Sequence, residues 1–444
     1  MNESIFKAYD IRGIYPSEID EETVYKIGCA VVSVLGAKKL AVGRDVRDSS
    51  PTLYDNLIKG ITDAGCDVVS LGVLTTPMVY FASGRLDVDG AISVTASHNP
   101  AQYNGIKIAR KNAIPVGSET GLTEIKELVI KNSFPEVQTK GAVIDNDITK
   151  EYYDTFSEFA HFGDKKFTII TDTANTMGVL ELEFYKRFPQ NITLITLYDD
   201  LEHPFTAHEA NPLNLETLSE LQERVIKEKA DIGIAYDGDA DRIGFVDETG
   251  AIIPMDLVTG LIAQILLKEN PGGLVLYDLR SSDAVRDAIG ENGGRATECR
   301  VGHSFIKKQM REEKAIFAGE LSGHYYFQQN YNAEMSTLAA FMLLNLMTET
   351  DKKISELVSH LRRYHHSGEI NSEVKDKDAT LQKLKENYAD GKLSELDGIK
   401  IRYPDWWLNV RPSNTEPVLR LNVEAKTQEL MEQKRDEILA IIRS

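Results

Sequence analysis

One strand–loop–helix plan occurs three times along the chain, and it constrains the fold more than any other feature of the sequence. The three copies are "KKLAVGRDVRDSSP" (38–51), "KKFTIITDTANTMG" (165–178) and "GGLVLYDLRSSDAV" (272–285). Each begins with lysines or glycines, continues as a short run rich in β-branched residues or leucine, and ends in a polar loop that leads into helical periodicity. This order of elements predicts α/β units.

A second apolar strand follows each unit after a helical stretch, and it also ends in a polar loop. These strands are "GAISVTASHNP" (90–100), "ADIGIAYDGDADR" (230–242) and "AIFAGELSGH" (315–324). Alternating strands and helices predict sheets with mainly parallel pairing and both faces buried. Because ligands bind beyond the carboxyl ends of such strands, the three loops are expected to contribute three parts of one site. The alternative is that they are generic loops whose patterns agree by chance.

The last region, residues 366–444, has a different pattern. In "GIKIRYPDWWLNVRPSNTEPVLRLNVEA" (398–425), apolar residues alternate, which predicts a small antiparallel sheet with a loop at 411–417. The alternating residues are Leu408, Val410, Val418, Leu419, Leu421 and Val423. The lysine-rich segment 367–391 predicts a helix before this sheet. The 444 residues are too many for one core, and the predicted domains are 1–147, 148–248, 249–365 and 366–444.

The composition excludes several classes of function. A formal charge of −19 and a pI near 5.0 argue against a nucleic-acid-binding protein, which needs a basic face. The most apolar segment, 335–347, is too short to span a membrane and is expected to form a core helix. Cys29, Cys66 and Cys299 are widely spaced, and the N-terminus has no signal-peptide pattern, so we expect a cytoplasmic protein with reduced, mostly buried thiols. No obligatory protein partner is evident.

The loop "DGDADR" (237–242) is the clearest metal-binding signal. Its alternating carboxylates are the hard oxygen ligands that Mg²⁺ and Ca²⁺ prefer; they are Asp237, Asp239 and Asp241. An EF-hand would place Glu248 at loop position twelve, but Arg242 stands where that loop needs glycine, and both flanks predict strands. The other alternative is an acidic surface turn. Because the loop follows a buried strand, the sequence favours a magnesium site.

Two further loops offer groups for a phosphorylated sugar. In "RPSNTEP" (411–417), Arg411 can bind a phosphate through two nitrogens, with an ordinary β-turn as the alternative. The neutral donors beside it are Ser413, Asn414 and Thr415. In "GELSGH" (319–324), the groups that suit sugar hydroxyls are Glu320, Ser322 and His324. A solvated glutamate and a structural histidine would explain this second loop equally well.

Ser97, in the loop after "GAISV", is a candidate nucleophile. No G-x-S-x-G motif surrounds it, which argues against an α/β-hydrolase. The neighbouring His98 is expected to point away from Ser97 and is a poor candidate for its base. A serine beside a magnesium loop and a phosphate loop favours phosphoryl transfer. A capping or turn serine is the alternative for this loop taken alone.

Together these loops resemble the α-D-phosphohexomutase family, specifically its bacterial phosphomannomutase/phosphoglucomutase branch. "FKAYDIRG" (6–13) opens the match, and "TASHNP", "DGDADR", "GELSGH" and "RPSNTEP" follow in the family's order over nearly the whole chain. The resemblance implies an α/β fold with three related mixed α/β domains around a central cleft. It also implies a smaller C-terminal α+β domain, similar to the TATA-box-binding protein.

The resemblance implies roles for individual residues. The catalytic residues would be Arg12, Ser97, His98, Lys107, Arg242, Arg280 and His303. The substrate-binding residues would be Tyr9, Glu320, Ser322, His324, Arg411, Ser413, Asn414 and Thr415. Ser97 would carry the phosphoryl group as a phosphoserine. One Mg²⁺ ion per chain would be held by Ser97, Asp237, Asp239 and Asp241.

One residue departs from the family's pattern. Arg280, in "DLRSSD" (278–283), stands where the better-known enzymes have a lysine considered for acid–base catalysis. Because an arginine stays protonated, it can stabilise charge but hardly act as a general base. If this alignment holds, proton transfer falls elsewhere, on Lys107 or His303.

The function implied by the resemblance is reversible transfer of a phosphoryl group between the 1- and 6-positions of a hexose, mannose or glucose. Phosphorylated Ser97 would donate to the free hydroxyl, and the resulting hexose 1,6-bisphosphate, both intermediate and activator, would turn and return its other phosphate. Hexose phosphates are therefore the expected partners. The alternatives are a Mg²⁺-dependent sugar phosphatase and a non-catalytic sugar-phosphate sensor.

Overall fold

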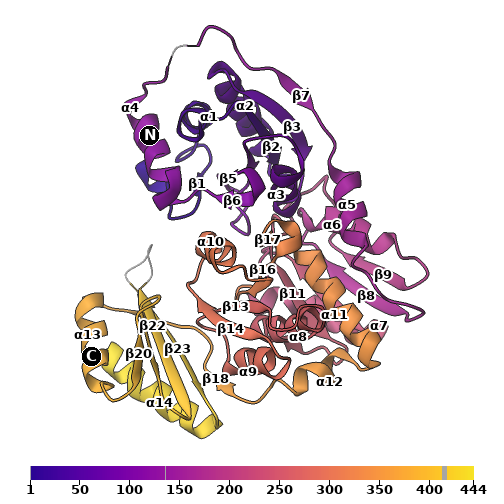
Figure 1. Cartoon of the computed structure of the whole chain (residues 1–444), viewed down its shortest axis with the longest axis vertical. Helices are drawn as coiled ribbons and strands as arrows, with labels where there is room; N and C mark the ends of the chain where they lie inside the picture. Colours follow the sequence, from indigo (N-terminus) through magenta and orange to yellow (C-terminus); the bar gives the residue numbers. More distant parts are fainter. Residues whose placement is uncertain (1, 136, 413–417) are drawn as a thin grey trace.

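Four β-sheets organise the protein in the computed structural model, which describes residues 2–135, 137–412 and 418–444 (Figure 1). The first sheet has the strand order β1-β5-β4-β2-β3-β7, with β6 beside β5. Its strands are β1 (Ile11–Ile14), β2 (Lys39–Arg44), β3 (Asp67–Val73), β4 (Gly90–Val94), β5 (Tyr103–Arg110), β6 (Ile114–Pro115) and β7 (Val143–Asp145). Its helices are α1 (Glu21–Leu35), α2 (Ser50–Asp63), α3 (Thr76–Arg85) and α4 (Thr123–Lys131).

The second sheet has the order β12-β11-β10-β8-β9 and the third β14-β13-β15-β16-β17. The strands of the second are β8 (Phe167–Asp172), β9 (Ile192–Leu197), β10 (Ile232–Tyr236), β11 (Ile243–Asp247) and β12 (Ile252–Ile253). Those of the third are β13 (Leu274–Asp278), β14 (Arg295–Cys299), β15 (Phe317–Gly319), β16 (Tyr325–Phe327) and β17 (Ala333–Glu334). The helices of this part are α5 (Thr149–Ser157), α6 (Gly178–Lys186), α7 (Ser219–Glu228), α8 (Met255–Glu269), α9 (Asp283–Glu291), α10 (His303–Glu313), α11 (Ser336–Thr350) and α12 (Ile354–Ser359).

The first three sheets repeat one four-strand arrangement. The matching orders are β5-β4-β2-β3, β11-β10-β8-β9 and β16-β15-β13-β14, which confirms the predicted threefold repeat. Two of the three pairings in each arrangement are parallel, as predicted, but each polar loop closes an antiparallel hairpin, which was not predicted: β4 with β5, β10 with β11 and β15 with β16. The other strands of each arrangement are parallel. The three loops therefore lie at equivalent strand ends of three sheets.

The fourth sheet is antiparallel throughout its described pairings, in the order β18-β23-β22-β21-β20 with β19 beside β23. Its strands are β18 (His365–His366), β19 (Ile370–Glu373), β20 (Lys392–Ser394), β21 (Ile399–Arg402), β22 (Trp406–Pro412) and β23 (Val418–Ala425), and its helices are α13 (Lys377–Asn387) and α14 (Gln428–Ile442). The predicted antiparallel sheet is confirmed, although Val418 is only half-buried. The lysine-rich segment forms β19 before α13, so the predicted helix covers only part of it.

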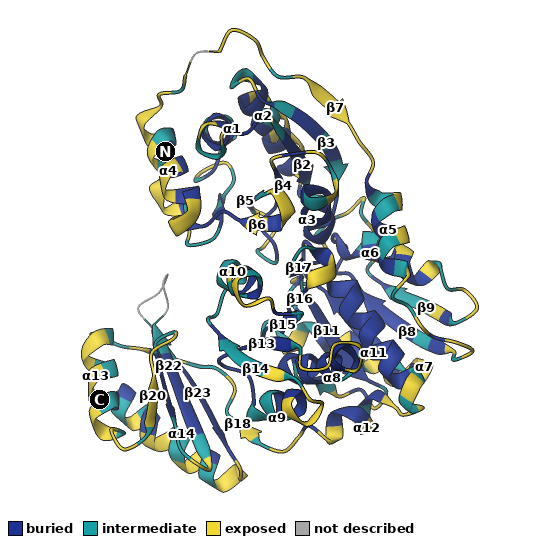
Figure 2. Ribbon diagram, viewed as in Figure 1, coloured by how far each residue is buried: buried dark blue, intermediate teal, exposed yellow. Residues whose placement is uncertain are grey.

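Apolar packing separates the fourth sheet from the other three. One buried cluster runs from Ala41 in β2 through the second and third sheets to Leu361. A separate cluster, from Leu384 to Ile442, joins the fourth sheet to its own helices. Figure 2 shows this second buried core apart from the larger one. Helix α11 is buried from Ser336 to Met347, which confirms the predicted core helix.

Cys29, Cys66 and Cys299 are buried free thiols, as predicted. None of the described helices combines the length and hydrophobicity that crossing a bilayer requires. The domain boundaries stay predictions. Strand β12, at 252–253, completes the second sheet beyond the proposed boundary at 248, and β18 begins the fourth sheet at His365.

Candidate active site

Ser97 lies immediately beyond β4, in a left-handed backbone conformation with φ of 52°. Its side chain is buried, and Oγ donates to Asp237 Oδ2 at 3.1 Å. Oγ also lies 3.3 Å from His98 Nδ1, so the prediction that His98 points away from Ser97 is wrong. Successive side chains alternate only in extended backbone, and the backbone at Ser97 has left that conformation.

Arg47 holds the serine loop in place. Its guanidinium, which is fully buried, donates to four carbonyl oxygens of the loop: those of Ser97 and Asn99 at 2.7 Å, Pro100 at 2.6 Å and Tyr103 at 3.1 Å. Five N–H donors in one rigid plane make arginine suited to such a bridge. We missed Arg47 in the sequence, since nothing in "GRDVRDSSP" distinguishes a structural arginine from a solvated one.

A second arginine reaches the same loop from the opening motif. Arg12, in β1, donates to Asn99 Oδ1 at 2.6 Å and forms an ion pair with Asp10 at 2.7 Å. It also approaches the carbonyl oxygen of Ala96 at 3.4 Å. The structure therefore places Arg12 beside the candidate nucleophile, on the side of the first sheet.

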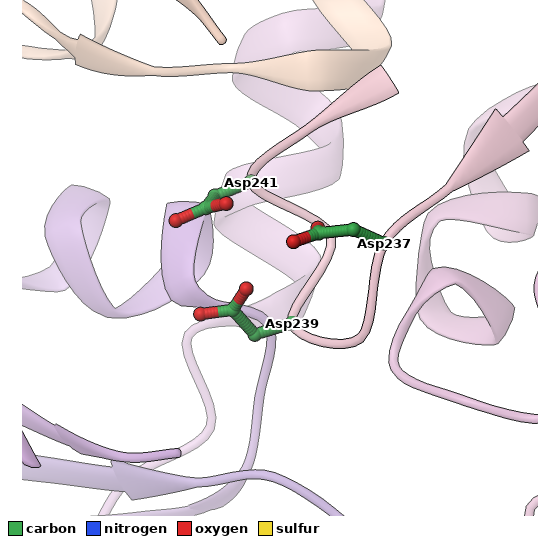
Figure 3. A group of neighbouring side chains, drawn as sticks. All are labelled: Asp237, Asp239 and Asp241. Carbon is green, nitrogen blue, oxygen red and sulfur yellow. The ribbon is translucent and has the colours of Figure 1, made fainter. Parts of the chain in front are cut away.

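The three aspartates of the metal loop converge between β10 and β11 (Figure 3). Each is almost fully buried, and one carboxylate oxygen from each lies within 4.8 Å of the others. Gly238 separates the first two aspartates, and a Cβ at this position would lie 2.3 Å from the carbonyl oxygen of Ser97. Glycine thus allows the metal loop and the serine loop to pack backbone against backbone.

These residues fit a divalent cation. Asp239 Oδ1 is buried and receives no hydrogen bond from the described residues, which is costly unless another ligand occupies it. Burial raises the pKa of Asp237 to about 8, and the charges of Asp241 and Asp239 add to the shift. A cation among the three carboxylates would offset this repulsion, and oxygen ligands of this kind favour Mg²⁺.

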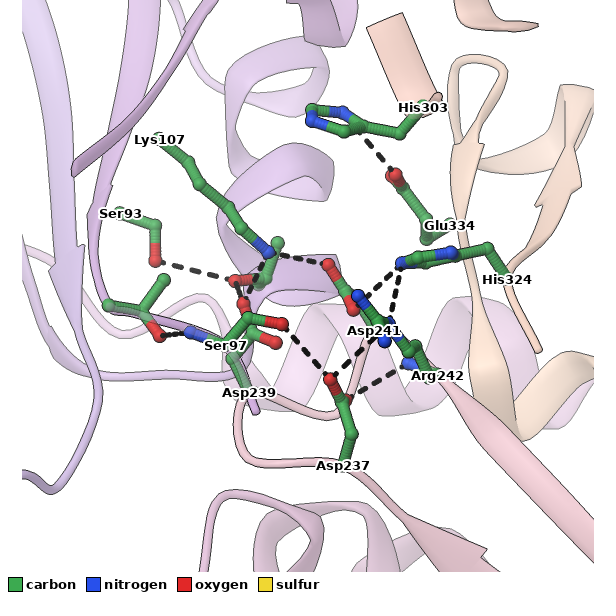
Figure 4. A network of polar contacts seen from close by, with 12 residues as sticks. Ser93, Ser97, Lys107, Asp237, Asp239, Asp241, Arg242, His303, His324 and Glu334 are labelled. Atoms are coloured by element: carbon green, nitrogen blue, oxygen red, sulfur yellow. Dashed lines mark hydrogen bonds and ion pairs between the residues drawn. The ribbon is translucent and has the colours of Figure 1, made fainter. Parts of the chain in front are cut away.

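Lys107, in β5, already compensates part of this negative charge. Its Nζ lies 2.6 Å from Asp239 Oδ2 and 2.6 Å from Asp241 Oδ2 (Figure 4). Burial alone would lower the pKa of Lys107, but the two carboxylates raise it well above its usual value. Lys107 is therefore held as a cation, which makes it a poor proton acceptor.

The third loop joins the same network through His324. Its Nε2 lies 3.2 Å from Asp241 Oδ1, and its Nδ1 lies 3.1 Å from Glu320 Oε2 and 2.8 Å from Ser322 Oγ. Although burial opposes the charged ring, Asp241 and Glu320 raise the pKa of His324 to about 9. Arg242 Nε lies 3.2 Å from His324 Nε2, so residues of the second and third hairpins are in direct contact.

His303 begins α10, on the far side of this network in Figure 4. The ring of Tyr9 packs edge-on against it, with centroids 5.5 Å apart. Its Nδ1 lies 3.8 Å from Glu334 Oε1, and Glu334 Oε2 pairs with the buried Lys307 at 2.7 Å. Burial and the neighbouring Lys307 keep the pKa of His303 well below its usual value. We missed Glu334 in the sequence because it stands alone among neutral residues.

Arg280 and Arg411 lie apart from this network. Arg280 follows β13 and pairs with Asp278, whose Oδ2 lies 2.5 Å from its Nη2. Arg411, in β22, pairs with Glu369 at 3.0 Å, and Arg280 approaches the same Glu369 oxygen at 3.5 Å. The remaining predicted phosphate ligands, Ser413, Asn414 and Thr415, lie outside the described residues.

Four consecutive segments match models of known domains. They are described as phosphoglucomutase/phosphomannomutase alpha/beta/alpha domain I (residues 3–136), domain II (150–250), domain III (254–364) and C-terminal domain (369–441). The chain belongs to the phosphoglucomutase/phosphomannomutase family. The phosphomannomutase of Methanocaldococcus jannaschii is 40% identical to this family member over 446 residues, covering 99% of this chain and 97% of the relative. That of Escherichia coli is 36% identical over 450 residues, covering 99% of each.

Solved structures agree with this family. A phosphoglucomutase/phosphomannomutase family protein from Burkholderia thailandensis has a TM-score of 0.91 at 29% identity, covering 99% of this chain and 97% of its own. The N-acetylphosphoglucosamine mutase of Aspergillus fumigatus, solved with GlcNAc-6P and magnesium, has a TM-score of 0.64 at 13% identity, with 99% and 95% covered. At that identity the likeness extends to the fold alone. The resemblance inferred from the five motifs and the multidomain α/β fold are both confirmed.

Proposed function

We propose that this protein is a phosphohexomutase, an isomerase that moves a phosphoryl group between the 1- and 6-positions of a hexose through a phosphoserine at Ser97. The observation that carries the proposal is the contact between Ser97 Oγ and Asp237 Oδ2 at 3.1 Å, inside a buried group of three aspartates. Relatives over the whole chain are phosphomannomutases. The two phosphomannomutases named above give no support to the phosphatase or the sensor.

Ser97 is the proposed phosphoryl carrier. In the first half-reaction its Oγ–P bond breaks while a bond forms from phosphorus to the free hydroxyl oxygen of a hexose monophosphate. The bisphosphate then turns, and its other phosphate returns to Ser97 by the reverse steps. A Mg²⁺ ion held by Ser97, Asp237, Asp239 and Asp241 would supply positive charge that stabilises the transferring phosphoryl oxygens. Arg12 and His98 adjoin Ser97 and supply further donors to the same centre.

His303 is the proposed group that accepts the proton of the attacking hydroxyl. Lys107 is held as a cation by two aspartates, and Arg280 is paired with Asp278. Burial and Lys307 lower the pKa of His303, so its ring is neutral at pH 7 and can accept a proton. Lys107 and Arg242 then remain available to stabilise negative charge.

The sugar loop and the arginine of the fourth sheet complete the proposed substrate site. Glu320, Ser322 and His324 form one hydrogen-bonded group and would bind sugar hydroxyls. Tyr9, packed against His303, would line the same space. Arg411 would bind the phosphate that is not reacting, with Ser413, Asn414 and Thr415 as its proposed neighbours. Mannose and glucose 1-phosphates are the proposed substrates, with the 1,6-bisphosphate as activator.

Turnover of hexose 1-phosphates in the presence of Mg²⁺ tests the proposal. The wild type should convert mannose or glucose 1-phosphate to the 6-phosphate, while Ser97→Ala should reduce this conversion to background. Ser33→Ala, which changes a surface serine of α1, is the control and should be fully active. Full activity of Ser97→Ala would refute the phosphoserine mechanism. Release of inorganic phosphate as fast as isomerisation would instead favour the phosphatase.

A further inference from the structure

The N-termini of three helices hold the backbone of the metal loop (237–242). Helix α3 follows a strand of the first sheet, α6 a strand of the second and α11 a strand of the third. Four consecutive carbonyl oxygens of the loop accept hydrogen bonds from residues at the start of these helices or within two positions before it. In loop order the bonds run from Thr176 Oγ1 to Asp237 O at 3.4 Å, from Met177 N to Gly238 O at 3.4 Å, from Thr76 N to Asp239 O at 3.1 Å and from Ser336 Oγ to Ala240 O at 2.7 Å. Because the N-terminal end of a helix carries a partial positive charge, all three helices favour an acidic loop at this place.

Thr76 differs from the other three donors because it also binds a carboxylate of the loop. Its side chain is fully buried, and Oγ1 donates to Asp239 Oδ2 at 2.6 Å. Lys107 Nζ donates to the same oxygen at 2.6 Å. Asp239 Oδ1 is the oxygen that receives no hydrogen bond from the described residues. Thr76 and Lys107 therefore fix one oxygen of this carboxylate and leave the other for a different ligand.

Glu181 of α6 fixes the position of Thr76 from behind. Thr75 caps α3 by accepting a hydrogen bond from Met78 N, and its Oγ1 donates to Glu181 Oε1 at 2.9 Å. The other oxygen of Glu181 accepts a hydrogen bond from Thr337 Oγ1 of α11 at 2.6 Å. One carboxyl group thus joins the starts of α3 and α11 to α6. The distance between Thr76 and Asp239 is set by this contact among three helices, and such support is what keeps a ligand in one orientation.

We propose that Thr76 is a positioning residue for the proposed Mg²⁺ site, and that its hydroxyl holds Asp239 Oδ2 so that Oδ1 stays available to the cation. The proposal rests on the proposed function, which places Mg²⁺ among the three aspartates. A hydroxyl suits this role because it orients the carboxylate without adding a positive charge, whereas the ammonium group of Lys107 competes electrostatically with the cation. Thr76 acts through Asp239.

Binding of Mg²⁺ to the intact, metal-free protein tests the role of Thr76. Titration calorimetry would compare the wild type with Thr76→Val, which keeps the shape of the side chain and removes the hydroxyl. The dissociation constant for Mg²⁺ should rise by about 10- to 100-fold, the usual effect of losing a partner of a metal ligand. Thr62→Val is the matched control, because the hydroxyl of this buried threonine bonds to carbonyl oxygens of its own helix, α2, and it should leave the affinity unchanged.

The conservative variant separates the hydroxyl from the packing. Thr76→Ser keeps the donor and loses the methyl group, so it should bind Mg²⁺ nearly as tightly as the wild type. Ser336→Ala removes a donor to a backbone carbonyl rather than to a carboxylate, so it should weaken Mg²⁺ binding by a smaller factor than Thr76→Val. If Thr76→Val does not fold, Thr76→Ala removes the hydroxyl without placing a methyl group against Asp239. Wild-type Mg²⁺ affinity in either folded variant, or a Thr76→Ser protein as weak as Thr76→Val, would overturn the proposal.

The outcome is separable from that of the proposed function, because binding is measured without turnover. A wild type that binds no Mg²⁺ would refute the proposed metal site and the role of Thr76 with it. Equal affinity in the wild type and Thr76→Val would overturn the role of Thr76 alone. Weaker binding in Thr76→Val together with full activity of Ser97→Ala would support Thr76 and refute the phosphoserine mechanism. In the active enzyme, raising the Mg²⁺ concentration should restore the kcat of Thr76→Val, with KM for the hexose phosphate unchanged.

Discussion

The junction between the second and third sheets is built differently from the junction between the third and fourth. At the first junction, Phe341 of α11 packs edge-on against four aromatic rings from the part of the chain that forms the second sheet: Phe162, Phe184, Tyr185 and Phe188. Glu181 of α6 lies there too, accepting hydrogen bonds from Thr75 at 2.9 Å and Thr337 at 2.6 Å. One apolar core thus spans the first three sheets.

The second junction depends on polar contacts. Arg402 donates to both oxygens of Asp283 at 2.6 Å and to Glu298 at 2.9 Å. Lys400 donates to Glu298 and to the carbonyl oxygen of Leu279. No buried apolar cluster of the described residues includes both sides. Polar contacts of this kind exchange readily with water or with another ligand, whereas an apolar core does not.

This contrast between the two junctions matches the roles proposed for the residues near each of them. Ser97, the aspartates and His324 lie on loops of the three sheets that the apolar core joins, where small displacements would disturb the proposed phosphoryl transfer. Arg411, the proposed phosphate ligand, belongs to the fourth sheet, which is held to the rest of the protein by ion pairs. The following experiments test whether the first junction depends on apolar packing and the second on polar contacts.

The largest effect is expected in the apolar core. Phe341→Ala should lower the free energy of unfolding by about 3–5 kcal/mol, because it removes a fully buried ring and leaves a cavity among four aromatic rings. Denaturant unfolding followed by tryptophan and far-ultraviolet signals would measure it. Both tryptophans belong to the fourth sheet, at 406 and 407, so their signal should change less than the far-ultraviolet signal. A loss below about 1 kcal/mol would contradict the shared core.

The next effect concerns pH and Glu181. Burial raises the pKa of this carboxyl in the folded protein from 4.5 to about 7. Between these values the folded state binds more protons than the unfolded state, so this group makes the free energy of unfolding fall as pH rises. At about 1.4 kcal/mol per pKa unit, the fall is about 3 kcal/mol. Glu181→Gln should remove this pH dependence, which unfolding at several pH values between 4.5 and 7 would measure. If the free energy of unfolding falls with pH equally in the variant and the wild type, Glu181 is not its source.

A smaller effect is expected at the polar junction. Arg402→Ala should weaken the docking of the fourth sheet against the rest of the protein by about 1–2 kcal/mol, because Asp283 and Glu298 each lose one of their two cationic partners. Scanning calorimetry should show this as a lower transition temperature for the fourth sheet and its helices alone. Arg435→Ala removes a half-buried arginine of α14 whose described ion pair is with its neighbour Asp436, so it is the control and should leave the transition in place. A single transition that shifts as a whole would show that the two parts are coupled.

The smallest effect is that of salt. Raising the salt concentration from about 0.1 to 1 M shortens the range of charge interactions from about 10 to 3 Å. It should therefore destabilise the polar junction by less than about 1 kcal/mol while leaving the apolar one unchanged. Comparing both calorimetric transitions across the salt series would test this. If salt lowers the transition temperature of the first three sheets more than that of the fourth, the contrast between an apolar and a polar junction is wrong.

Sequence patterns predicted the parts of the fold that repeat. Strand–loop–helix periodicity located β2, β8 and β13 because buried parallel strands need continuous apolar runs. We did not predict that β5, β11 and β16 pair antiparallel with the strands before them, since the sequence of a short apolar strand does not show the direction of its partner. At the site, the spacing of the aspartates was enough to predict that their carboxylates come together, because the three residues lie on one loop.

Residues that reach the site only through the fold, from distant parts of the sequence, could not be found from sequence patterns. Arg47 and Glu334 carry no local pattern, and only the folded chain brings them to Ser97 and His303. The contact of His98 with Ser97 depends on a backbone angle that residue types alone do not specify. Glu369 is 42 residues from Arg411 in sequence, and the pairing becomes visible only once the fourth sheet is formed.

The left-handed backbone at Ser97 also restricts which hydroxyl amino acid can stand there. With φ of 52°, a residue branched at Cβ is strained, because its second substituent meets the neighbouring backbone. Threonine carries the same oxygen and has comparable chemistry, yet this position disfavours it. Serine, which has one fewer methyl group, is the hydroxyl residue that the turn accepts, so the shape of the backbone restricts the proposed phosphoryl carrier to serine before reactivity does.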